Sequence, residues 1–545
     1  MRENFMNSGR LVRLILRRER VMSTVWIGIL VLFSAALAPG MAGMFDAGAR
    51  QQFAESFNNP VMIAMMGPVY GADNYTAGAM YGNMMLLWII IAAAVMNIFL
   101  LVRHTRADEE KGRTEVVRSL PTGRLANLHA AMIAAAALNA VLALLTGLGL
   151  AAAGVESMDL AGSLLYGAVV GVSGLLFAAV AALFSQLSAN KNGAAGLSFL
   201  AVGVFYLLRA AGDMKNEVLS LISPLGLAQR SRVYVENRWW PVWILLAETV
   251  VIAAAAYLLN TLRDLDQGFI HARPGRREAS AALRSPFGLA FRLLRNTLII
   301  WLIIMLILGA SYGSIIGDIF KFVGDSPDYL TIIGVPPEVV ENLPAAEKEK
   351  IVVEYFGVFV TAMMTLIGLV PLLTAAMKAR GEEKEGRAEQ VLIRPVPRGR
   401  YLAGYTALAF AASVLMPCAA AAGLYSAAAA DGTNPFTVGG LLEAHLVYLP
   451  ALWVMIGAAV LITGLAPRIS GAVWGYYGFV CFVTLMGGIP GLLPGWLTAL
   501  SPLRYIPRLP MEDVNYIVLA ALTAVAAGLT VGGFVFYRRR DVGSS

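Results

Sequence analysis

The sequence predicts an all-α integral membrane protein with about 12 transmembrane helices in two parallel six-helix repeats, each preceded by an amphipathic interfacial helix. Three observations support this prediction. Of the 545 residues, 58% are hydrophobic and only 14% are charged, whereas soluble domains carry roughly 25% charged residues. Apolar stretches of about 20 residues, the length that crosses a bilayer, recur along the whole chain. A charged motif also occurs twice, once in each half.

The charged motif reads R-x-[DE]-E-x-x-G-R-x-E and then P-x-G-R, with two extra residues in the second copy. Each copy follows one long apolar stretch and precedes another, so we expect both to lie in water. Gly112 and Gly386 interrupt the two copies at the same place, which predicts a bend. Duplication of this pattern predicts that the protein presents the same kind of surface twice. The copies cover residues 106–115 with 121–124, and residues 380–389 with 397–400.

The first half begins with residues 6–20, where arginines recur at helical spacing. This pattern predicts a basic helix lying on the membrane surface, although a plain basic flank of the first span would look the same. Asn59 and the Met66–Gly71 stretch fall in an exterior loop after the first span. The expected spans of this half are 22–44, 83–103, 125–154, 160–187, 193–212 and 240–262.

The second half repeats this order after an arginine-rich linker at 263–285. Pro286 opens a second amphipathic segment. Residues 187–194 align with 465–472, and Arg263 and Arg540 follow the last span of each half. We therefore expect a first repeat at 1–262 and a second at 286–545. The expected spans of the second half are 297–317, 352–377, 401–426, 437–463, 471–493 and 513–537.

The net charge of +7 is concentrated in particular loops, which indicates membrane topology rather than nucleic-acid binding. Lys and Arg favour the side that carries both termini, the linker and the two motifs, although the loop at 213–239 is an exception. These parts are predicted to be cytoplasmic. Six spans per half return the chain to the same side, so the repeats are expected to be parallel rather than inverted.

No site for chemistry stands out in the sequence, so we expect no catalytic, cofactor or metal site on this chain. It contains no G-x-x-x-x-G-K-[ST] phosphate loop. The G-x-S-x-G match at 309–313 lies in an apolar helix without the strand–turn–helix that a nucleophile needs. Its glycines, like Gly167/Gly171 and Gly471/Gly475, instead predict close helix packing.

Six ionisable residues lie in or near the expected spans, and any of them could line a proton or substrate path. Most are close to span ends, which favours placement at the membrane surface. Glu248 lies well inside its span and is the candidate for a substrate path. The six residues are His129, Arg209, Glu248, Glu354, Glu443 and His445.

The two motifs, the Met66–Gly71 stretch and the Ser-Pro-Leu loops at 223–225 and 501–503 resemble those of ABC-2-type exporter permeases. The closest resemblance is to fused two-repeat bacterial permeases regarded as exporters of polyketide antibiotics, including tetronasin. It covers essentially the whole chain. It implies a permease of the bacterial plasma membrane that moves hydrophobic or amphiphilic compounds outward.

The resemblance also implies a partner. In that superfamily the loop after the second span docks on a separate ATPase, so two copies of an ABC ATPase subunit, holding ATP and Mg, would bind here. Asn190-Lys191 and Arg468-Ile469 would form secondary contacts. The residues implied in coupling are Asp108, Glu109, Gly112, Arg113 and Glu115, and Glu382, Glu383, Gly386, Arg387 and Glu389.

The physical argument agrees with this implication, because uphill export needs energy and the chain has neither a nucleotide motif nor a convincing ion relay. Two alternatives remain. A twelve-span secondary carrier would need polar residues at the membrane midplane and no ATPase. A lipid-modifying enzyme would need clustered acidic, His or Arg residues at one membrane face. Membrane lipid and an amphiphilic small molecule are the other expected partners, and nucleic acid is not.

Overall fold

A computed structural model describes residues 2–57, 60–215, 217–264, 267–270, 278–314, 344–430, 436–486 and 494–540. The described chain is helical, with one isolated bridge between Ser188 and Ile270. It divides into two compact units, Met1–Pro274 and Gly275–Ser545. The division falls inside the segment expected to be a linker.

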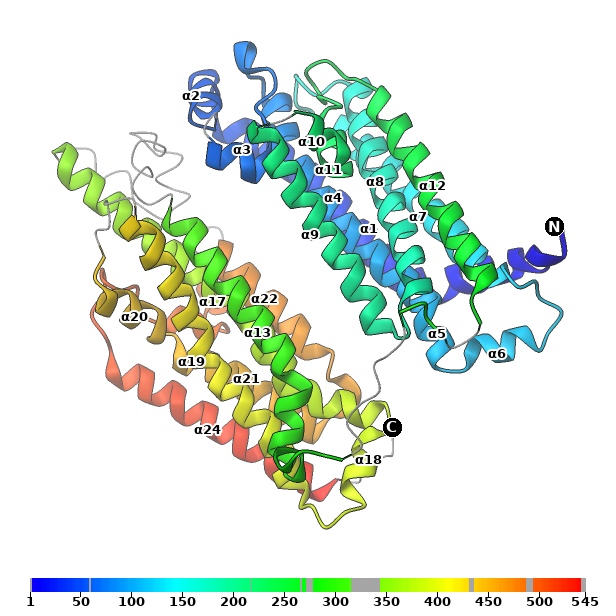
Figure 1. Ribbon diagram of the computed structural model, residues 1–545. Helices are drawn as coiled ribbons and strands as arrows, with labels where there is room; N and C mark the ends of the chain where they lie inside the picture. The colour runs from blue at the N-terminus through cyan, green and yellow to red at the C-terminus, as the bar shows by residue number, and fades with distance from the viewer. Residues whose placement is uncertain are drawn as a thin grey trace. The chain divides into compact units, whose positions relative to one another are not determined.

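In the first unit, the long helix α8 packs against α4, α7, α9 and α12 (Figure 1). The motif helices α5 and α6 lie at one end of this unit, and the short helices α2, α3 and α10 lie at the other (Figure 1). Its helices are α1 Ser8–Met44, α2 Ala47–Phe57, α3 Pro60–Met66, α4 Ala77–His104, α5 Arg106–Glu110, α6 Arg113–Arg118, α7 Ala126–Ala151, α8 Leu160–Leu187, α9 Lys191–Lys215, α10 Glu217–Ile222, α11 Pro224–Gln229 and α12 Trp240–Leu262.

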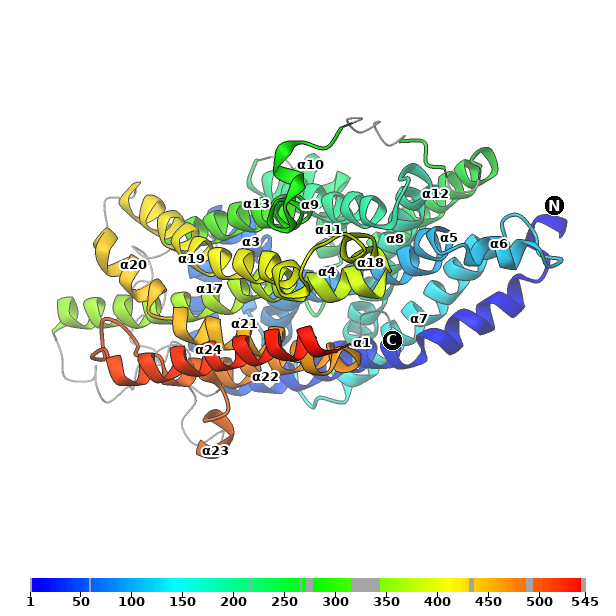
Figure 2. The same cartoon turned by 90° about the horizontal axis from the view of Figure 1, so that it is seen from below.

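In the second unit, α13 packs along α19, and α21 packs along α24. The second pair runs side by side in Figure 2. The described helices are α13 Pro286–Gly313, α17 Ala345–Lys384, α18 Arg387–Leu392, α19 Arg398–Ala430, α20 Val438–Leu446, α21 Leu449–Leu465, α22 Ala472–Met486, α23 Gly495–Thr498 and α24 Tyr516–Arg539.

Eleven helices of the described chain are long and apolar enough to cross a membrane. The prediction of a helical, multi-pass protein is therefore confirmed. The expected span at 471–493 is represented by the shorter α22, and its last residues fall outside the described chain. The count of twelve and the pairing into two six-helix repeats stay predictions. The expected exterior loop after the first span contains two short helices, α2 and α3.

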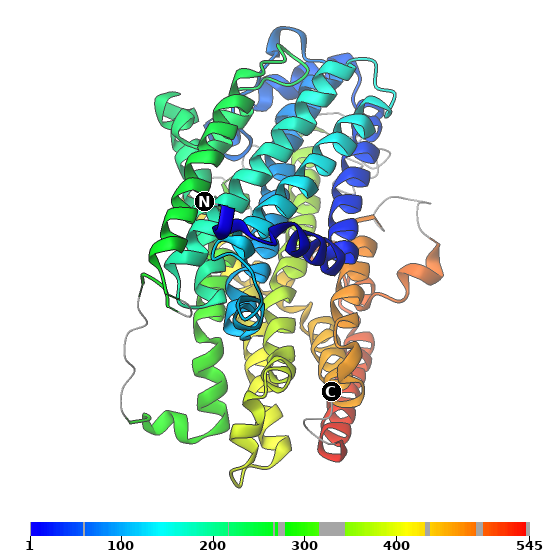
Figure 3. The same cartoon turned by 90° about the vertical axis from the view of Figure 1, so that its right-hand side faces the viewer.

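The two expected amphipathic segments do not form separate helices. Residues 8–20 of the first segment run on into the first span within α1, and Pro286 opens α13, which continues into the seventh expected span. Figure 3 shows that α1 changes direction between its first part and the rest. The residues on both sides of each expected boundary favour helix, so the sequence pattern does not show whether the helix breaks between the amphipathic segment and the span.

Glycines and asparagines hold the helices of the first unit close together. A Cβ on Gly167 of α8 would lie 2.1 Å from the Ala143 carbonyl oxygen of α7, so only glycine permits this approach. Asn97 of α4 and Asn139 of α7 exchange side-chain hydrogen bonds of 3.0 and 2.7 Å and are at most 2% exposed. Such paired amides satisfy each other in an apolar interior.

Close packing is confirmed at four of the expected glycines. Gly167 and Gly171 pack against α7, and Gly309 and Gly313 pack against α19. At Gly471 and Gly475 an added Cβ would meet no described atom within 4 Å, so the prediction is wrong there. Gly317, the next glycine at the spacing of Gly309 and Gly313, was also expected to pack closely and lies outside the described residues.

Cysteine labelling tests the predicted topology. We expect Glu115→Cys and Glu389→Cys, at exposed motif positions, to react with a membrane-impermeant maleimide only when the cytoplasmic side is open. Glu156→Cys, between α7 and α8, should react from outside intact cells. The native Cys418 and Cys481 are replaced first. Labelling of Glu115→Cys from outside intact cells would reverse the predicted orientation.

Candidate functional site

The two copies of the charged motif fold in the same way. In each, a helix ends just before a glycine with positive φ, and a six-residue helix begins just after it. Gly112 has φ 66° before α6, and Gly386 has φ 71° before α18. An added Cβ would meet nothing within 4 Å at either position. The glycines are therefore needed for the left-handed backbone conformation and not for space, which confirms the predicted bend.

An arginine–glutamate–arginine triad anchors each motif, and in the first unit it is fully buried. In the first unit, Glu109 accepts from Arg106 at 2.9 Å and from Arg263, beyond the end of α12, at 2.8 Å. All three side chains are at most 7% exposed. Removing one partner from such a buried set lowers the free energy of unfolding, because the remaining charges are shielded from water and lose their counterion.

The second unit contains the matching triad. Glu383 lies 3.5 Å from Arg380 and 2.6 Å from Arg540, the residue just beyond the end of α24. The Glu383 side chain is 3% exposed. The arginine that follows the last helix of each unit is therefore paired with the second acidic residue of the motif. The sequence showed these arginines at matching positions but not what they bind.

The first acidic residue of each motif holds the short helix that follows the glycine. Arg113 contacts Asp108 at 2.9 Å, and Arg387 contacts Glu382 through two bonds of 2.6 and 2.8 Å. The Glu382 carboxylate raises the pKa of the Arg387 guanidinium. Glu109–Arg113 and Glu383–Arg387 have the four-residue spacing of helical ion pairs. The structure instead pairs the two arginines with Asp108 and Glu382, across the bend at the glycine.

The motifs are also tied to the loop between the fourth and fifth expected spans. Arg106 donates to the carbonyl of Ala189 at 2.6 Å, and Arg380 donates to the carbonyl of Pro467 at 3.0 Å. These two carbonyls occupy equivalent places in the aligned stretches. Lys191 donates its backbone N–H to Glu110 at 2.5 Å. A force on either motif would therefore act on the ends of several helices of the same unit.

Only part of each motif is available to a partner. Asp108, Glu109 and Glu382 are at most 8% exposed, so the protein itself covers part of each charged segment. Glu115 and Glu389 are exposed on the short helices. Beside them lie Val116, Leu120 and Ile393, which are 68%, 59% and 84% exposed. Arg113 and Arg387, at the start of the two helices, are about half exposed as well. The outward surface of α6 and α18 with their flanking residues thus carries acidic, basic and apolar side chains.

In the first unit, ion pairs link the motif and the end of α4 to the first helix. Arg18 of α1 contacts Asp108 at 2.9 Å, and Glu19 accepts from Arg103 at 2.9 Å and contacts His104 at 2.8 Å. Residues Arg292 and Leu293 of α13 are exposed in the second unit. The two motifs therefore share an internal frame but differ in what supports them.

Comparison with known proteins places this arrangement in a family. The family model described as "Multidrug efflux system permease Rv1217c, C-terminal domain" matches residues 10–259 and 283–538. The chain belongs to this family. It is 34% identical to the multidrug efflux system permease protein Rv1217c of Mycobacterium tuberculosis (strain ATCC 25618 / H37Rv) over 548 residues. The match covers 98% of this chain and 94% of that protein.

Membership in the Rv1217c permease family, together with eleven candidate membrane spans, makes the chain a multi-pass membrane transport component. Both stretches matched by the family model contain one copy of the motif and the helices that flank it. The residues that carry the resemblance to exporter permeases are therefore included in the matched stretches.

Two of the six ionisable residues are more deeply buried in this permease than their sequence positions suggested. Arg209 is 0% exposed and contacts Asp213 at 3.4 Å and the carbonyl of Ala64 at 2.6 Å. His445 is 1% exposed and its Nδ1 lies 2.8 Å from the Leu441 carbonyl. Sequence reasoning missed Asp213, although its spacing of four residues from Arg209 was a usable signal.

Glu248 remains the candidate that the sequence favoured for a substrate path. It is half-buried on α12, and its Oε2 has no hydrogen-bond partner among the described residues. Glu354 lies within 4.0 Å of Lys350, and His129 contacts the Tyr257 hydroxyl at 2.8 Å. Neither residue is grouped with Glu248 by any described contact.

Proposed function

We propose that this chain is the transmembrane subunit of an ATP-driven exporter of hydrophobic or amphiphilic compounds. Two copies of a separate ABC ATPase would dock on α6 and α18. The relative from M. tuberculosis is named a multidrug efflux system permease, which supports export of such compounds. ATP and Mg would be held by the ATPase. The membrane would be the bacterial plasma membrane, with both termini in the cytoplasm.

The observation that carries this proposal is the duplicated frame under the exposed short helices. Each triad joins the motif to the last helix of its unit, and each motif arginine joins it to the loop before the fifth expected span. An ATPase that moved α6 or α18 would move these helix ends with it. A loop that served only as a topology signal would need basic residues, but not a buried acidic residue shared by two arginines.

A secondary carrier is the second candidate, because Glu248 has an unpartnered buried oxygen that could bind a proton or a cationic substrate. A secondary carrier would be driven by an ion gradient and not by ATP. It does not explain why the same frame of buried charges, with an exposed short helix of charged and apolar residues, is built twice.

Reconstitution separates the two candidates. We expect the purified chain alone to hydrolyse no ATP and to move no dye in vesicles under a pH gradient. We expect both activities to appear when an ABC ATPase from the same organism is added with Mg-ATP. Transport by the chain alone under a pH gradient, lost in Glu248→Gln, would establish the carrier instead.

A further inference from the structure

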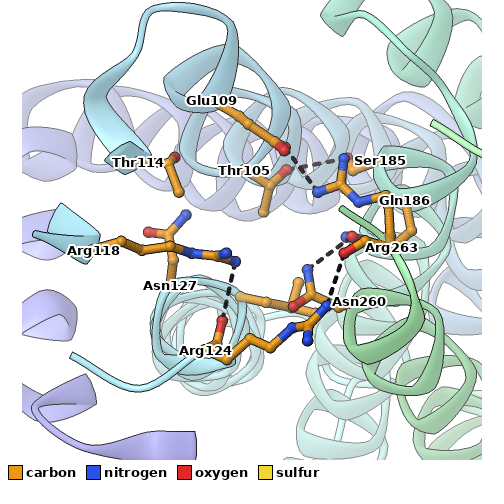
Figure 4. Close-up of a pocket in the computed structure, with 11 residues that line it drawn as sticks. Thr105, Glu109, Thr114, Arg118, Arg124, Asn127, Ser185, Gln186, Asn260 and Arg263 are labelled. Carbon is orange, nitrogen blue, oxygen red and sulfur yellow. Dashed lines mark hydrogen bonds and ion pairs between the residues drawn. The ribbon is translucent and has the colours of Figure 1, made fainter. Parts of the chain in front are cut away.

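A pocket lies directly beneath the first motif, where α4, α6, α7, α8 and α12 approach their ends (Figure 4). It holds about 350 Å³ of empty space, including the part open to solvent. All of its lining residues except Leu128 have polar side chains, although four candidate membrane spans contribute to it. Its polar residues are Thr105, Glu109, Thr114, Arg118, Arg124, Asn127, Ser185, Gln186, Asn260 and Arg263.

The charge of the pocket favours an anion. Three guanidinium groups line it, from Arg118, Arg124 and Arg263, against the single carboxylate of Glu109. That carboxylate is already shared by two arginines of the triad. Arg118 and Arg124 form no ion pair with any described acidic residue; their described bonds go to the carbonyls of Arg124 and Arg263, at 3.4 and 3.0 Å.

The pocket also contains hydrogen-bonding groups that the protein leaves unused. The Thr114 hydroxyl has no partner among the described residues, although Thr114 is only 6% exposed. The Arg263 Nε is likewise buried without a partner. A guanidinium has five N–H donors, so Arg118 and Arg124 retain several. Buried polar groups normally have hydrogen-bond partners, and a bound anion would supply them here. Burial also lowers the pKa of the Arg118 guanidinium, and an anion beside it would stabilise its positive charge.

The depth of the pocket suggests the chemical class of that anion. Three candidate spans end beside the pocket, at Glu110, Leu187 and Leu262, and a fourth begins beside it, at Ala126. All four boundaries surround the pocket, at the level where lipid phosphates lie if these helices cross a bilayer. Basic pockets between helix ends at this level bind anionic head groups, and arginine binds phosphate through paired N–H donors.

We propose that this pocket binds a phosphate group, supplied by an anionic phospholipid head group or by a soluble phosphate. Bound there, the phosphate would contact Arg118 and Arg124 and accept from the Thr114 hydroxyl. The site is adjacent to the Glu109 triad, so its occupancy would stabilise the first motif. It does not depend on the proposed ATPase.

The second unit provides an internal comparison. At three of the places that match the pocket by motif spacing, small or apolar residues replace the polar ones. Thr114 corresponds to Ala388, Arg118 to Leu392 and Asn127 to Ala403. Arg124 and Arg263 are retained as Arg400 and Arg540. The polar side chains of Thr114 and Arg118 therefore belong to the first unit and are not a requirement of the motif frame.

Lipid binding to the purified full chain tests this inference. We expect phosphatidylglycerol to raise the melting temperature saturably, phosphatidylcholine to have little effect, and native mass spectrometry to detect retained phosphatidylglycerol. Arg118→Leu and Thr114→Ala introduce the residues that the second unit has at the matching positions, so both variants should fold. Because each removes a contact to a charged group, Arg118→Leu should weaken binding about tenfold or more, and Thr114→Ala should weaken it less. Arg394→Leu, an exposed arginine of the second unit, is the control.

Inorganic phosphate distinguishes the source. If millimolar phosphate stabilises the chain in an Arg118-dependent way and phosphatidylglycerol does not, a soluble phosphate is the ligand. If phosphatidylglycerol stabilises it and phosphate only competes weakly, the ligand is the lipid. If the wild type, Arg118→Leu and Thr114→Ala respond equally to both compounds, or if no compound has any effect, the pocket is not a phosphate site.

Discussion

Replacing Glu109 with alanine is expected to destabilise the first unit by about 3–5 kcal/mol, the usual cost of removing one member of a buried charge set. Arg106 and Arg263 would keep their positive charges in a place where they are at most 7% exposed. The measurement is the thermal melting of the purified protein, together with its yield from membranes. Glu383→Ala should act in the same direction, with a smaller effect because Arg380 and Arg540 are 12% and 16% exposed.

Glu115→Ala is the matched control, because it removes an exposed acidic residue from the same motif and should change stability by less than about 0.5 kcal/mol. The exchange Glu109→Arg with Arg263→Glu should recover part of the lost stability. If Glu109→Ala melts at the temperature of Glu115→Ala, the triad is not a structural anchor.

Replacing Gly423 or Gly309 with valine is expected to separate α13 from α19. An added Cβ would lie 2.0 Å from the Leu306 carbonyl oxygen at Gly423, and 2.1 Å from the Ala420 carbonyl oxygen at Gly309. Backbone atoms cannot move aside like flexible side chains, so each change should cost about 1–3 kcal/mol or more. The measurement is again thermal melting in detergent.

Gly475→Val serves as the control for this prediction, because an added Cβ at Gly475 meets nothing within 4 Å. It should melt close to the wild type. Equal melting of Gly423→Val and Gly475→Val would show that α13 and α19 do not approach as closely as the structure indicates.

The helical spans were largely predictable from the sequence. The expected spans 160–187 and 240–262 coincide with α8 and α12. Each is a long apolar stretch with polar residues at both ends, and Glu248 is the one charged residue inside either of them. The break between α20 and α21, near Tyr448, was not predicted. Apolar residues continue across that break, so hydropathy alone gives no sign of it.

The candidate site was predictable in position but not in orientation. Duplication located the motifs, and Gly112 and Gly386 located the bends. The direction in which Glu109 points depends on its contact with Arg263, which is 154 residues away in the sequence. A pattern of helical spacing relates only residues a few positions apart, so it does not predict this contact. The matching positions of Arg263 and Arg540 were the available signal. The pocket beneath Glu109 was not predictable, because its polar residues come from five separate segments.

The proposed docking of an ATPase on α6 and α18 is tested most directly by reversing Glu115 and Glu389, which are exposed and outside the buried frame. We expect Glu115→Lys with Glu389→Lys to fold normally, yet to lose ATPase co-purification and ATP-driven drug export. A reversed charge at an interface costs about 2–5 kcal/mol, roughly thirtyfold or more in affinity. Glu156→Lys with Glu347→Lys, exposed positions outside the motifs, should retain both activities. Full ATPase association and full export in the Glu115/Glu389 double variant would contradict the account.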